Sequence, residues 1–525
     1  MISENEPAGQ LKQGLHQIAL QKYKTVHAQA LQMIKANVSN AVPYCLLATI
    51  AAEHGNHIKA CELFKRAASL ESNNVWYQAF FGKALTTLGH QSLAKEVADK
   101  AAKLPVDDAI IADTIGVIYS RTGFHENAVP FFRKAVSLNP APANFHYNLA
   151  ASQQFLGNFK AAEDALKKTL KRDPKAYRAW SSLVGLKRQT EDHNALQSLK
   201  ALFEELTNNV DATLHLGHAI AKTLEDLGRF EESLDWLDAA KRGKRRAPVE
   251  NPIHYKSLFE AAGKTISRTP STNSASQNSP IFIIGLPRTG TTMVDRILSS
   301  HTQVTSAGEL NVFPGLIKQA TGTKSNLVMD QATLHQANNI DLGAIGQAYI
   351  EETKQLSRGN VYFTDKMPLN FFYAGLIHRA LPEAKIIVLR RNAMDSCLSN
   401  YRQLLTVQHS YYQYTYSLSD IAQFYRRFDK LMASLRESLP DSRFMEIRYE
   451  DIVFDQQNQT QRLLKFCNLN WEEACLRFHE NEAPVSTASS VQVRQPLYSS
   501  SIGRYKRYGE KLNGLRDALG SLADV

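Results

Sequence analysis

A short turn with a glycine at each end lies between an apolar run and a helical pattern, and its residue types point most directly to chemistry. Residues 281–284 have the length and composition of a buried strand, and the turn at 285–290, GLPRTG, follows them. A helical pattern begins near Thr291. Strand, glycine turn and helix together form a cradle for phosphate, because backbone N–H groups and the positive end of the helix dipole converge on an anion.

The turn differs in one position from the nucleotide-triphosphatase pattern G-x-x-x-x-G-K-[ST]. Thr291 stands where that pattern has the Lys that contacts the β- and γ-phosphates, and Arg288 supplies a cation from inside the turn. We therefore expect an anion site that is not built for ATP hydrolysis. A glycine turn without a ligand is the alternative that the turn alone leaves open.

Three further apolar runs, at 361–363, 385–389 and 444–449, are expected to be strands. Lys366 comes just beyond the first run, and Arg391 follows the second. Ligands of open α/β sheets bind at the carboxyl ends of the strands, so a ligand site is expected there. The C-terminal half is predicted to be an α/β P-loop-like domain with a parallel sheet.

The N-terminal half repeats with a period of 34 residues. Glycines recur at this interval, and small or apolar residues recur at fixed offsets after them. The members are Gly55, Gly89, Gly123 and Gly157, then Ala60, Ala94, Ala128 and Ala162, then Phe64, Ala98, Phe132 and Leu166. This is the tetratricopeptide pattern, which predicts an all-α solenoid whose concave face binds an extended peptide or partner.

The repeat phase breaks after Pro174, and a degenerate unit follows around residues 227–230. The basic run at 241–246 could contact an anion or form a solvated helix end. Residues 266–279 are rich in Ser, Thr and Asn, which is typical of a linker. We predict a solenoid over 1–265, a linker over 266–279 and a catalytic domain over 280–525.

The composition sets the broad class of protein. The 525 residues suffice for two or three domains, and the net charge of +10 suits an anionic ligand without indicating nucleic-acid binding. Five scattered cysteines form no C-x-x-C pair, so neither a disulfide framework nor a zinc site is indicated. The polar N-terminus does not have a secretion-signal pattern, and no apolar run is long enough to span a membrane. We expect a cytoplasmic location.

The sequence GLPRTGTT after a strand, with Gly308-Glu309-Leu310 downstream, resembles the 5′-phosphosulfate loop of sulfotransferases. These enzymes use 3′-phosphoadenosine 5′-phosphosulfate (PAPS). The chain is similar to the tyrosylprotein-sulfotransferase-like branch (the sulfotransferase 3 family), in the bacterial-type form with tetratricopeptide repeats ahead of the catalytic domain. The resemblance implies PAPS as the co-substrate and no metal. Animal members are membrane-anchored in the Golgi, so the expected cytoplasmic location departs from them.

The resemblance also implies roles for individual residues. Glu309 matches the general base that takes the proton of the acceptor hydroxyl, and Lys366 matches the Lys that contacts the transferring group, with Arg288 as a third catalytic residue. Arg391 and Ser399 match the 3′-phosphate site, where Arg390 would substitute if the register were shifted by one. After the first Arg the family has Asp-Pro-Arg or Asp-Gly-Arg, whereas residues 392–394 are Asn-Ala-Met.

The other implied cofactor contacts come from the turn, the fourth strand and a polar tract near the C-terminus. They are Arg288, Thr289, Gly290, Thr291, Thr292, Tyr449, Ser489, Ser490, Gln492 and Arg494. Tyr449 could equally be a core aromatic residue, and one of Ser489 and Ser490 is expected to contact the cofactor. Arg504 and Lys506 could add positive charge.

These motifs, in family order, predict a PAPS-dependent sulfotransferase whose acceptor is a protein tyrosine. A carbohydrate or small-molecule hydroxyl would use the same core residues. A P-loop kinase is opposed by the missing Lys, and a repeat scaffold with an inactive catalytic domain is opposed by Glu309, Lys366, Arg391 and Ser399. The expected partner is an acceptor protein or peptide bound through the solenoid, with no nucleic acid. The oligomeric state is not indicated.

Overall fold

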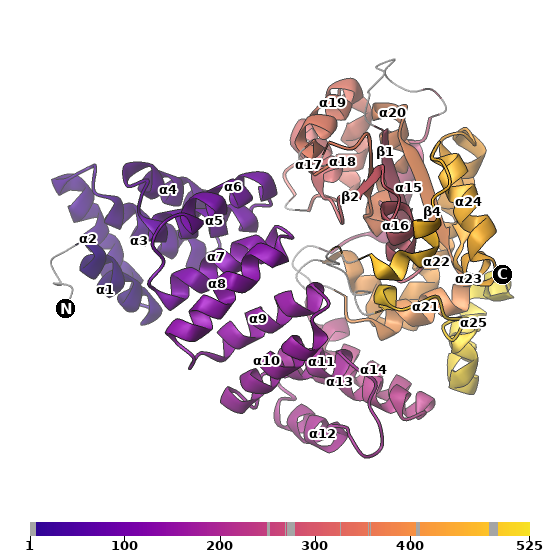
Figure 1. The fold of residues 1–525 in the computed structure, drawn as a ribbon, viewed down its shortest axis with the longest axis horizontal. Coiled ribbons are helices and arrows are strands. Elements are labelled where there is room, and N and C mark those ends of the chain that lie inside the picture. Colours follow the sequence, from indigo (N-terminus) through magenta and orange to yellow (C-terminus); the bar gives the residue numbers. More distant parts are fainter. Residues whose placement is uncertain are drawn as a thin grey trace. The chain divides into compact units, whose positions relative to one another are not determined.

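The chain folds into two compact units, Met1–Ala179 and Trp180–Val525. The computed structural model describes residues 7–248, 252–267, 269, 279–325, 327–354, 356–357, 359–405, 410–481, 483 and 492–524. Figure 1 traces the helices and strands along the chain. The expected fold class is confirmed, because helical repeats precede a domain with a parallel sheet.

The first unit consists of successive helix pairs. Its helices are α1 (Pro7–Ala19), α2 (Tyr23–Ala36), α3 (Ala41–Glu53), α4 (His57–Leu70), α5 (Val75–Thr87), α6 (Gln91–Ala102), α7 (Ala109–Arg121), α8 (His125–Leu138), α9 (Ala143–Phe155) and α10 (Phe159–Arg172). The four periodic glycines, Gly55, Gly89, Gly123 and Gly157, all have φ between 76° and 85°. Because L side chains are strained in this region, glycine lets each pair turn within a few residues.

A further group of helices precedes the sheet and belongs to the second unit, apart from the first residues of α11. They are α11 (Tyr177–Gly185), α12 (Leu196–Glu205), α13 (Val210–Asp226), α14 (Phe230–Arg246) and α15 (Tyr255–Lys264). The degenerate repeat predicted around 227–230 is the turn between α13 and α14, and Gly228 has φ 79° there. The basic run ends α14, where Lys244 pairs with Asp211 at 2.6 Å.

Five parallel strands make one sheet in the order β2-β3-β1-β4-β5. They are β1 (Ser279–Gly285), β2 (Val304–Ser306), β3 (Tyr362–Asp365), β4 (Lys385–Arg390) and β5 (Phe444–Arg448). The four predicted strands are confirmed, although β5 ends before Tyr449, which begins α23 (Tyr449–Phe454). Strand β2 was not predicted, since three residues give too short a pattern.

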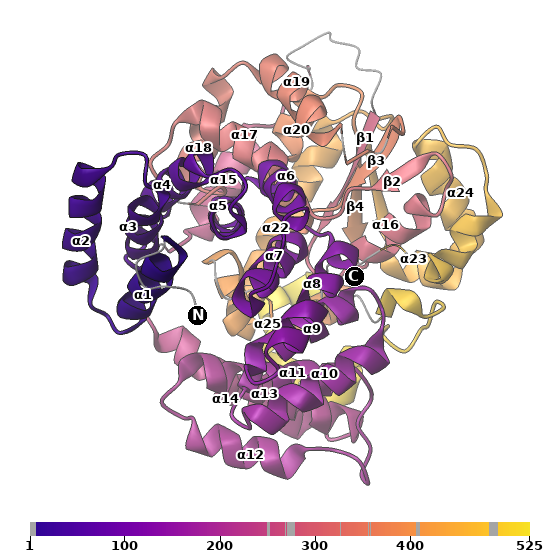
Figure 2. The ribbon, with the colours of Figure 1, turned by 60° about the vertical axis from the view of Figure 1, so that its left-hand side comes forward.

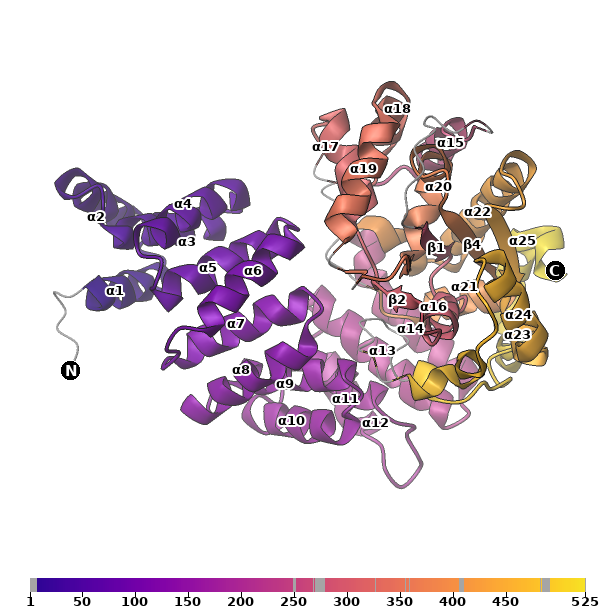
Figure 3. The ribbon, with the colours of Figure 1, turned by 45° about the horizontal axis from the view of Figure 1, so that its top comes forward.

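Helices cover both faces of the sheet, as Figures 2 and 3 show. The α-helices after β1 are α16 (Thr291–Ser299), α17 (Val312–Thr321), α18 (Gln331–Gln336), α19 (Leu342–Thr353), α20 (Ala374–Ala380), α21 (Ala393–Arg402), α22 (Leu418–Ser438), α23, α24 (Gln456–Phe466) and α25 (Asn513–Leu519). The 3-10 helices are η1 (Ala337–Asn339), η2 (Pro368–Tyr373), η3 (Ser410–Tyr416), η4 (Glu473–Glu480), η5 (Gln492–Arg494), η6 (Arg504–Leu512) and η7 (Gly520–Asp524).

Alternate residues of β1 belong to different cores. Ile281 and Ile283 pack with α16 and α24, whereas Phe282 and Ile284 pack with α17, α19 and α22. Burial on both faces explains why the strand reads as a continuous apolar run rather than an alternating one.

The packing groups the residues before the predicted linker with the sheet. Phe259 of α15 is 6% exposed and lies against three aromatic rings, with centroid distances of 5.9 Å to Phe371, 4.7 Å to Phe372 and 5.0 Å to Phe424. Helix α15 thus packs with the elements around the sheet, in agreement with the division into compact units after Ala179. Most of the predicted linker, residues 268 and 270–278, lies outside the described part of the chain, so the limits 1–265, 266–279 and 280–525 stay a prediction.

A protease of broad specificity is expected to cut first between residues 270 and 278, because a stretch rich in Ser, Thr and Asn offers little to pack. The two fragments should stay associated after the cut, since α15 lies on one side of it and its aromatic partners on the other. Size-exclusion chromatography of the nicked chain should give one peak. Fragments that separate without denaturant, or first cuts elsewhere, would contradict this expectation.

Candidate functional site

The turn between β1 and α16 has a conformation that its glycines and their neighbours enforce. Gly285, Arg288 and Gly290 have φ of 145°, 67° and 107°. A Cβ atom on Gly285 would lie 2.7 Å from the Leu389 carbonyl oxygen, and one on Gly290 would lie 2.8 Å from the Tyr449 ring. The glycines therefore let β4 and α23 approach the turn closely, and the turn leads directly into the N-terminus of α16.

The threonines of the turn are buried. Thr289, Thr291 and Thr292 are 1%, 4% and 6% exposed, and the Thr289 hydroxyl donates to the Leu286 carbonyl oxygen at 2.7 Å. That hydrogen bond closes the turn on itself. The turn is thus held by its own hydrogen bond and by the packing around its threonines.

Arg391 joins the turn to the end of β4 and to the C-terminal segment. Its Nη1 donates to the Arg288 carbonyl oxygen at 3.0 Å, and its Nη2 donates to the Ser501 carbonyl oxygen at 2.6 Å. The guanidinium lies over the Tyr449 ring, 4.9 Å from its centroid, and the Tyr449 and Ser501 hydroxyls are 2.7 Å apart. Buried Nε has no hydrogen-bond partner among the described residues. Arg391 therefore keeps a donor at the turn.

Arg390 lies elsewhere. It forms an ion pair with Asp429 of α22, lies 3.7 Å from Glu446 of β5, and its guanidinium lies over the Phe428 ring. Of the two adjacent arginines, the structure brings Arg391 to the turn.

Helix α21 is fixed against the same turn. The Asn392 side chain caps it by accepting from the Asp395 N–H at 3.1 Å, and the Asn400 amide donates to the Pro287 carbonyl oxygen at 2.8 Å. Ser399 lies one residue before Asn400 and is 9% exposed. Of the predicted pair, Arg391 lies just before α21 and Ser399 lies within it. Arg391 and the neighbour of Ser399, Asn400, both contact the turn.

Glu309 and Lys366 form an ion pair at the carboxyl end of β3. The Lys366 side chain is 1% exposed and that of Glu309 is 37% exposed. The chain after β2 continues along β3, because Ala307 N–H donates to the Thr364 carbonyl and Lys366 N–H donates to the Gly308 carbonyl, each at 2.9 Å. This pairing is what brings Glu309, from a loop, beside Lys366.

The polar tract near the C-terminus reaches the turn through Gln492. Gln492 accepts from the Arg288 guanidinium at 2.7 Å, and burial lowers the pKa of Arg288 to about 10. Arg494 follows in η5, where its charge adds to the larger effect of burial in lowering the pKa of Arg296. Ser489 and Ser490 lie outside the described residues.

Several residues that the sequence did not single out hold the site together. Asp395 accepts from the N–H groups of Gly503 at 2.6 Å and Tyr505 at 3.1 Å. Asp395 and Ser399 stand four residues apart and so share a helix face, which was a usable signal. Ser501, by contrast, has no local pattern that could have identified it.

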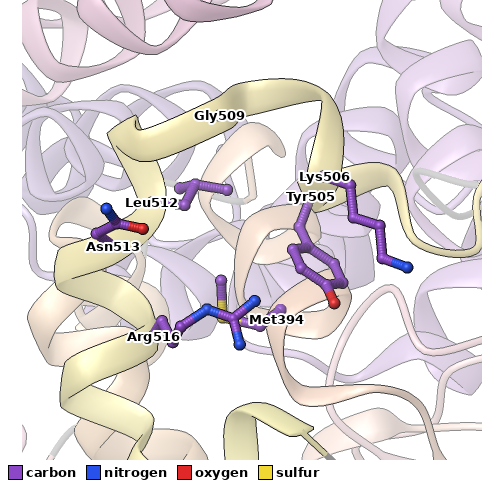
Figure 4. Close-up of a pocket in the computed structure, with 7 residues that line it drawn as sticks. All are labelled: Met394, Tyr505, Lys506, Gly509, Leu512, Asn513 and Arg516. Atoms are coloured by element: carbon purple, nitrogen blue, oxygen red, sulfur yellow. The ribbon is translucent and has the colours of Figure 1, made fainter.

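Arg504 and Lys506, considered as extra cations, have contacts of other kinds. Arg504 bonds Glu225 at 3.0 Å, and Lys506 lines a pocket of about 240 Å³. Figure 4 shows Arg516 and Tyr505 directed toward Met394 in this pocket, while the Lys506 amine points away from them. None of the proposed catalytic and cofactor-binding residues that the structure describes lines it.

Asp365, next to Lys366, is fully buried and bonded to the Tyr349 hydroxyl at 2.9 Å. Burial raises its pKa to about 7 from a usual value of 3.8, against the opposing effects of that hydrogen bond and of Lys366.

The raised pKa of Asp365 predicts a pH dependence of stability. Between about pH 4 and 7 the folded chain binds a proton that the unfolded chain releases, so the free energy of unfolding should fall as pH rises through this window. Asp365→Asn should remove this decline, which urea unfolding at pH 5, 6, 7 and 8 would measure. Asp330→Asn is the matched control, because the pKa of Asp330 is lowered despite burial through its bonds to Lys318 and Thr333. Equal profiles for the native chain and Asp365→Asn would contradict the assignment.

Comparison with known proteins bears on both units. A sulfotransferase family model matches residues 280–473, and a tetratricopeptide-repeat model matches residues 123–186. An uncharacterized protein of Aquifex aeolicus (strain VF5) is 32% identical over 246 residues, covering 46% of this chain and 32% of that protein. A protein-tyrosine sulfotransferase of Drosophila melanogaster is 23% identical over 239 residues, covering 43% and 46%.

The chain thus spans less than half the length of these two relatives. A sulfotransferase domain from the curacin biosynthetic pathway is similar at 15% identity and a TM-score of 0.31, covering 46% of this chain and 97% of that domain. No helix among the described residues is long and apolar enough to cross a membrane. Tetratricopeptide repeats thus precede a stretch, residues 280–473, that is similar to the sulfotransferase family.

Proposed function

We propose that this chain is a sulfotransferase that moves a sulfuryl group from PAPS to the hydroxyl of a protein tyrosine. One observation carries the proposal. The glycine turn, Arg391 and Lys366 follow three neighbouring strands, β1, β4 and β3, at the carboxyl ends where open α/β sheets bind ligands, and Glu309 pairs with Lys366 there. All of these residues lie within the stretch that the sulfotransferase model matches.

The residues present fit a nucleotide with phosphate groups at both ends of its ribose. The Nε of Arg391 is a buried donor without a partner among the described residues, on a side chain whose Nη1 contacts the turn. PAPS, when bound, supplies the sulfuryl group. In this proposal Arg391 and Ser399 hold the 3′-phosphate, and Arg288 with the N-terminus of α16 holds the 5′ side.

Further residues complete the proposed nucleotide site. Tyr449 lies beneath the Arg391 guanidinium, and Gln492 orients Arg288 through their hydrogen bond. The whole proposed set is Arg288, Thr289, Gly290, Thr291, Thr292, Arg391, Ser399, Tyr449, Ser489, Ser490, Gln492 and Arg494. A metal is not part of the proposal.

On the acceptor side, Glu309 takes the proton of the hydroxyl, which is worth about 10²–10⁴-fold in rate for a well-placed base. Lys366 and Arg288 neutralise negative charge that develops as the group is transferred. Losing one such preorganised donor typically costs about 2.7–4 kcal/mol of transition-state stabilisation. The ion pair keeps both side chains in place until the acceptor arrives.

The choice of a tyrosine acceptor rests on the relatives that are named protein-tyrosine sulfotransferases. A carbohydrate or small-molecule hydroxyl would use the same residues. Transfer from labelled PAPS to whole-cell extract, followed by identification of the labelled product, distinguishes these acceptors. Binding of the acceptor protein by the repeats and a cytoplasmic location belong to the same proposal.

Arg391→Ala should remove most of the preference for 3′,5′-adenosine bisphosphate over 5′-AMP. A buried charged contact is worth about 2 kcal/mol or more, so the ratio of the two dissociation constants should fall by roughly 30-fold or more. Isothermal titration calorimetry measures both constants. Arg390→Ala is the matched control and should keep the preference, because Arg390 pairs with Asp429. Equal affinity of the native chain for both nucleotides would overturn the 3′-phosphate site.

Glu309→Gln should keep nucleotide affinity and lower kcat by about 10²-fold or more, because the amide cannot accept the proton. The control is Glu472→Gln, a carboxylate whose partners among the described residues are Thr302, with an N–H bond of 2.9 Å, and His301. Near-normal transfer by Glu309→Gln would assign the base elsewhere. Loss of nucleotide binding as well would show that Glu309 maintains the fold of the site.

A further inference from the structure

A buried carboxylate on α13 receives hydrogen bonds from two segments that border the candidate site. Glu225 is 6% exposed, and its two oxygens accept from both the Nε and the Nη2 of Arg402. The same carboxylate accepts from Arg504 Nη2 at 3.0 Å and from the Tyr508 hydroxyl at 2.5 Å. Burial raises the pKa of Glu225, but Arg402 and Arg504 more than offset this, so its pKa lies below the usual value and the group is ionised.

The first of these donors belongs to the helix that contacts the turn. Arg402 is the last residue of α21 and stands three residues after Ser399 and two after Asn400, which bonds the Pro287 carbonyl oxygen. His218, also on α13, hydrogen-bonds the Arg402 carbonyl oxygen at 3.2 Å through its Nδ1. Helix α13 therefore contacts the C-terminal residue of α21 twice. Glu225 binds the Arg402 side chain, and His218 binds the Arg402 main chain.

The other two donors belong to the segment that covers Arg391. Ser501, which accepts from Arg391, precedes Arg504 by three residues, and Gly503 and Tyr505 donate their N–H groups to Asp395 of α21. Glu225 and Asp395 thus bind neighbouring positions of this segment. Glu225 accepts from the side chains of Arg504 and Tyr508, and Asp395 accepts from the main chain of Gly503 and Tyr505. Two half-buried arginines share one buried counter-charge, so its removal would leave them unpaired and mutually repelling.

We propose that Glu225 is a positioning residue for nucleotide binding, which holds α21 and the segment 501–508 in the arrangement that presents Arg391 and Ser399. The inference rests on the proposed function, because the nucleotide is what the two segments would grip. It assigns to α13, whose sequence reads as a degenerate repeat, a place in the nucleotide site. Within the described part of the chain, the hydrogen bonds of this carboxylate involve neither the turn nor the predicted ligand residues.

The test uses the full chain, 3′,5′-adenosine bisphosphate as the probe, and the variants Glu225→Gln, Glu225→Asp and Tyr508→Phe. Glu225→Gln should raise the dissociation constant about tenfold or more, within the range usual for coupling between linked sites. Glu225→Asp keeps the charge and should recover part of the loss, and Tyr508→Phe, which removes one neutral donor, should have the smallest effect. Asp330→Asn is the control: its partners Lys318 and Ser325 lie outside α21 and the segment 501–508, so nucleotide affinity should not change.

Trypsin supplies a second readout that needs no nucleotide, because Arg504, Lys506 and Arg507 are cleavage sites within the segment. Cleavage there should be faster in Glu225→Gln than in the native chain or in Asp330→Asn. Native-like affinity and cleavage in Glu225→Gln would overturn the inference while leaving the proposed function intact. If the native chain does not bind the bisphosphate, the proposed function fails and the inference fails with it. If Glu225→Gln does not fold, a native-like affinity in both Glu225→Asp and Tyr508→Phe would overturn it.

Discussion

The close approach of β4 and α23 to the glycine turn is the constraint on which the rest of the site depends. Backbone atoms of Leu389 and the ring of Tyr449 occupy the space that Cβ atoms at Gly285 and Gly290 would need. Because the turn is so tightly enclosed, its main-chain carbonyls at Pro287 and Arg288 become acceptors for Asn400 and Arg391. The turn, α21 and the end of β4 are therefore joined by hydrogen bonds and close packing.

A parallel sheet explains how short motifs far apart in the chain reach this assembly. The strands β3, β1 and β4 are adjacent, so their carboxyl ends bring Lys366, the turn and Arg391 to one edge. The acidic partner of Lys366 arrives differently, since Glu309 is held by main-chain hydrogen bonds between the loop after β2 and β3. Lys366 and Arg391 thus follow strands of the sheet directly, whereas Glu309 comes from a loop that is hydrogen-bonded to β3.

The sequence predicted the repeats, the four longer strands and the grouping of Arg391 with the turn, because each rests on a local pattern of period, apolar run or spacing. It left the choice between Arg390 and Arg391 open, because two neighbouring arginines cannot be distinguished by a local pattern. The structure distinguishes them, since Arg390 pairs with Asp429 and Glu446. It missed β2, whose three residues carry no pattern, and Ser501 and Glu225, whose partners lie 110 and 177 residues away in the chain. Contacts of that kind depend on how the elements pack, which no local window contains.

Helices α13 and α14 show how a repeat-like sequence can serve a different packing. Their glycine turn matches that of the true repeats, yet they belong to the compact unit of the sheet. Two charged residues on them are buried: Glu225 meets Arg402 and Arg504, and Lys241 donates to the Thr415 carbonyl oxygen at 2.8 Å beneath the Tyr401 ring. Burial lowers the pKa of Lys241 to about 7. Charges buried in this way are costly unless fixed partners surround them, so the face that carries them is committed to the sheet domain and unavailable for stacking another repeat. The repeat pattern therefore specifies the helical hairpin, and the charged residues on its face specify what the hairpin packs against.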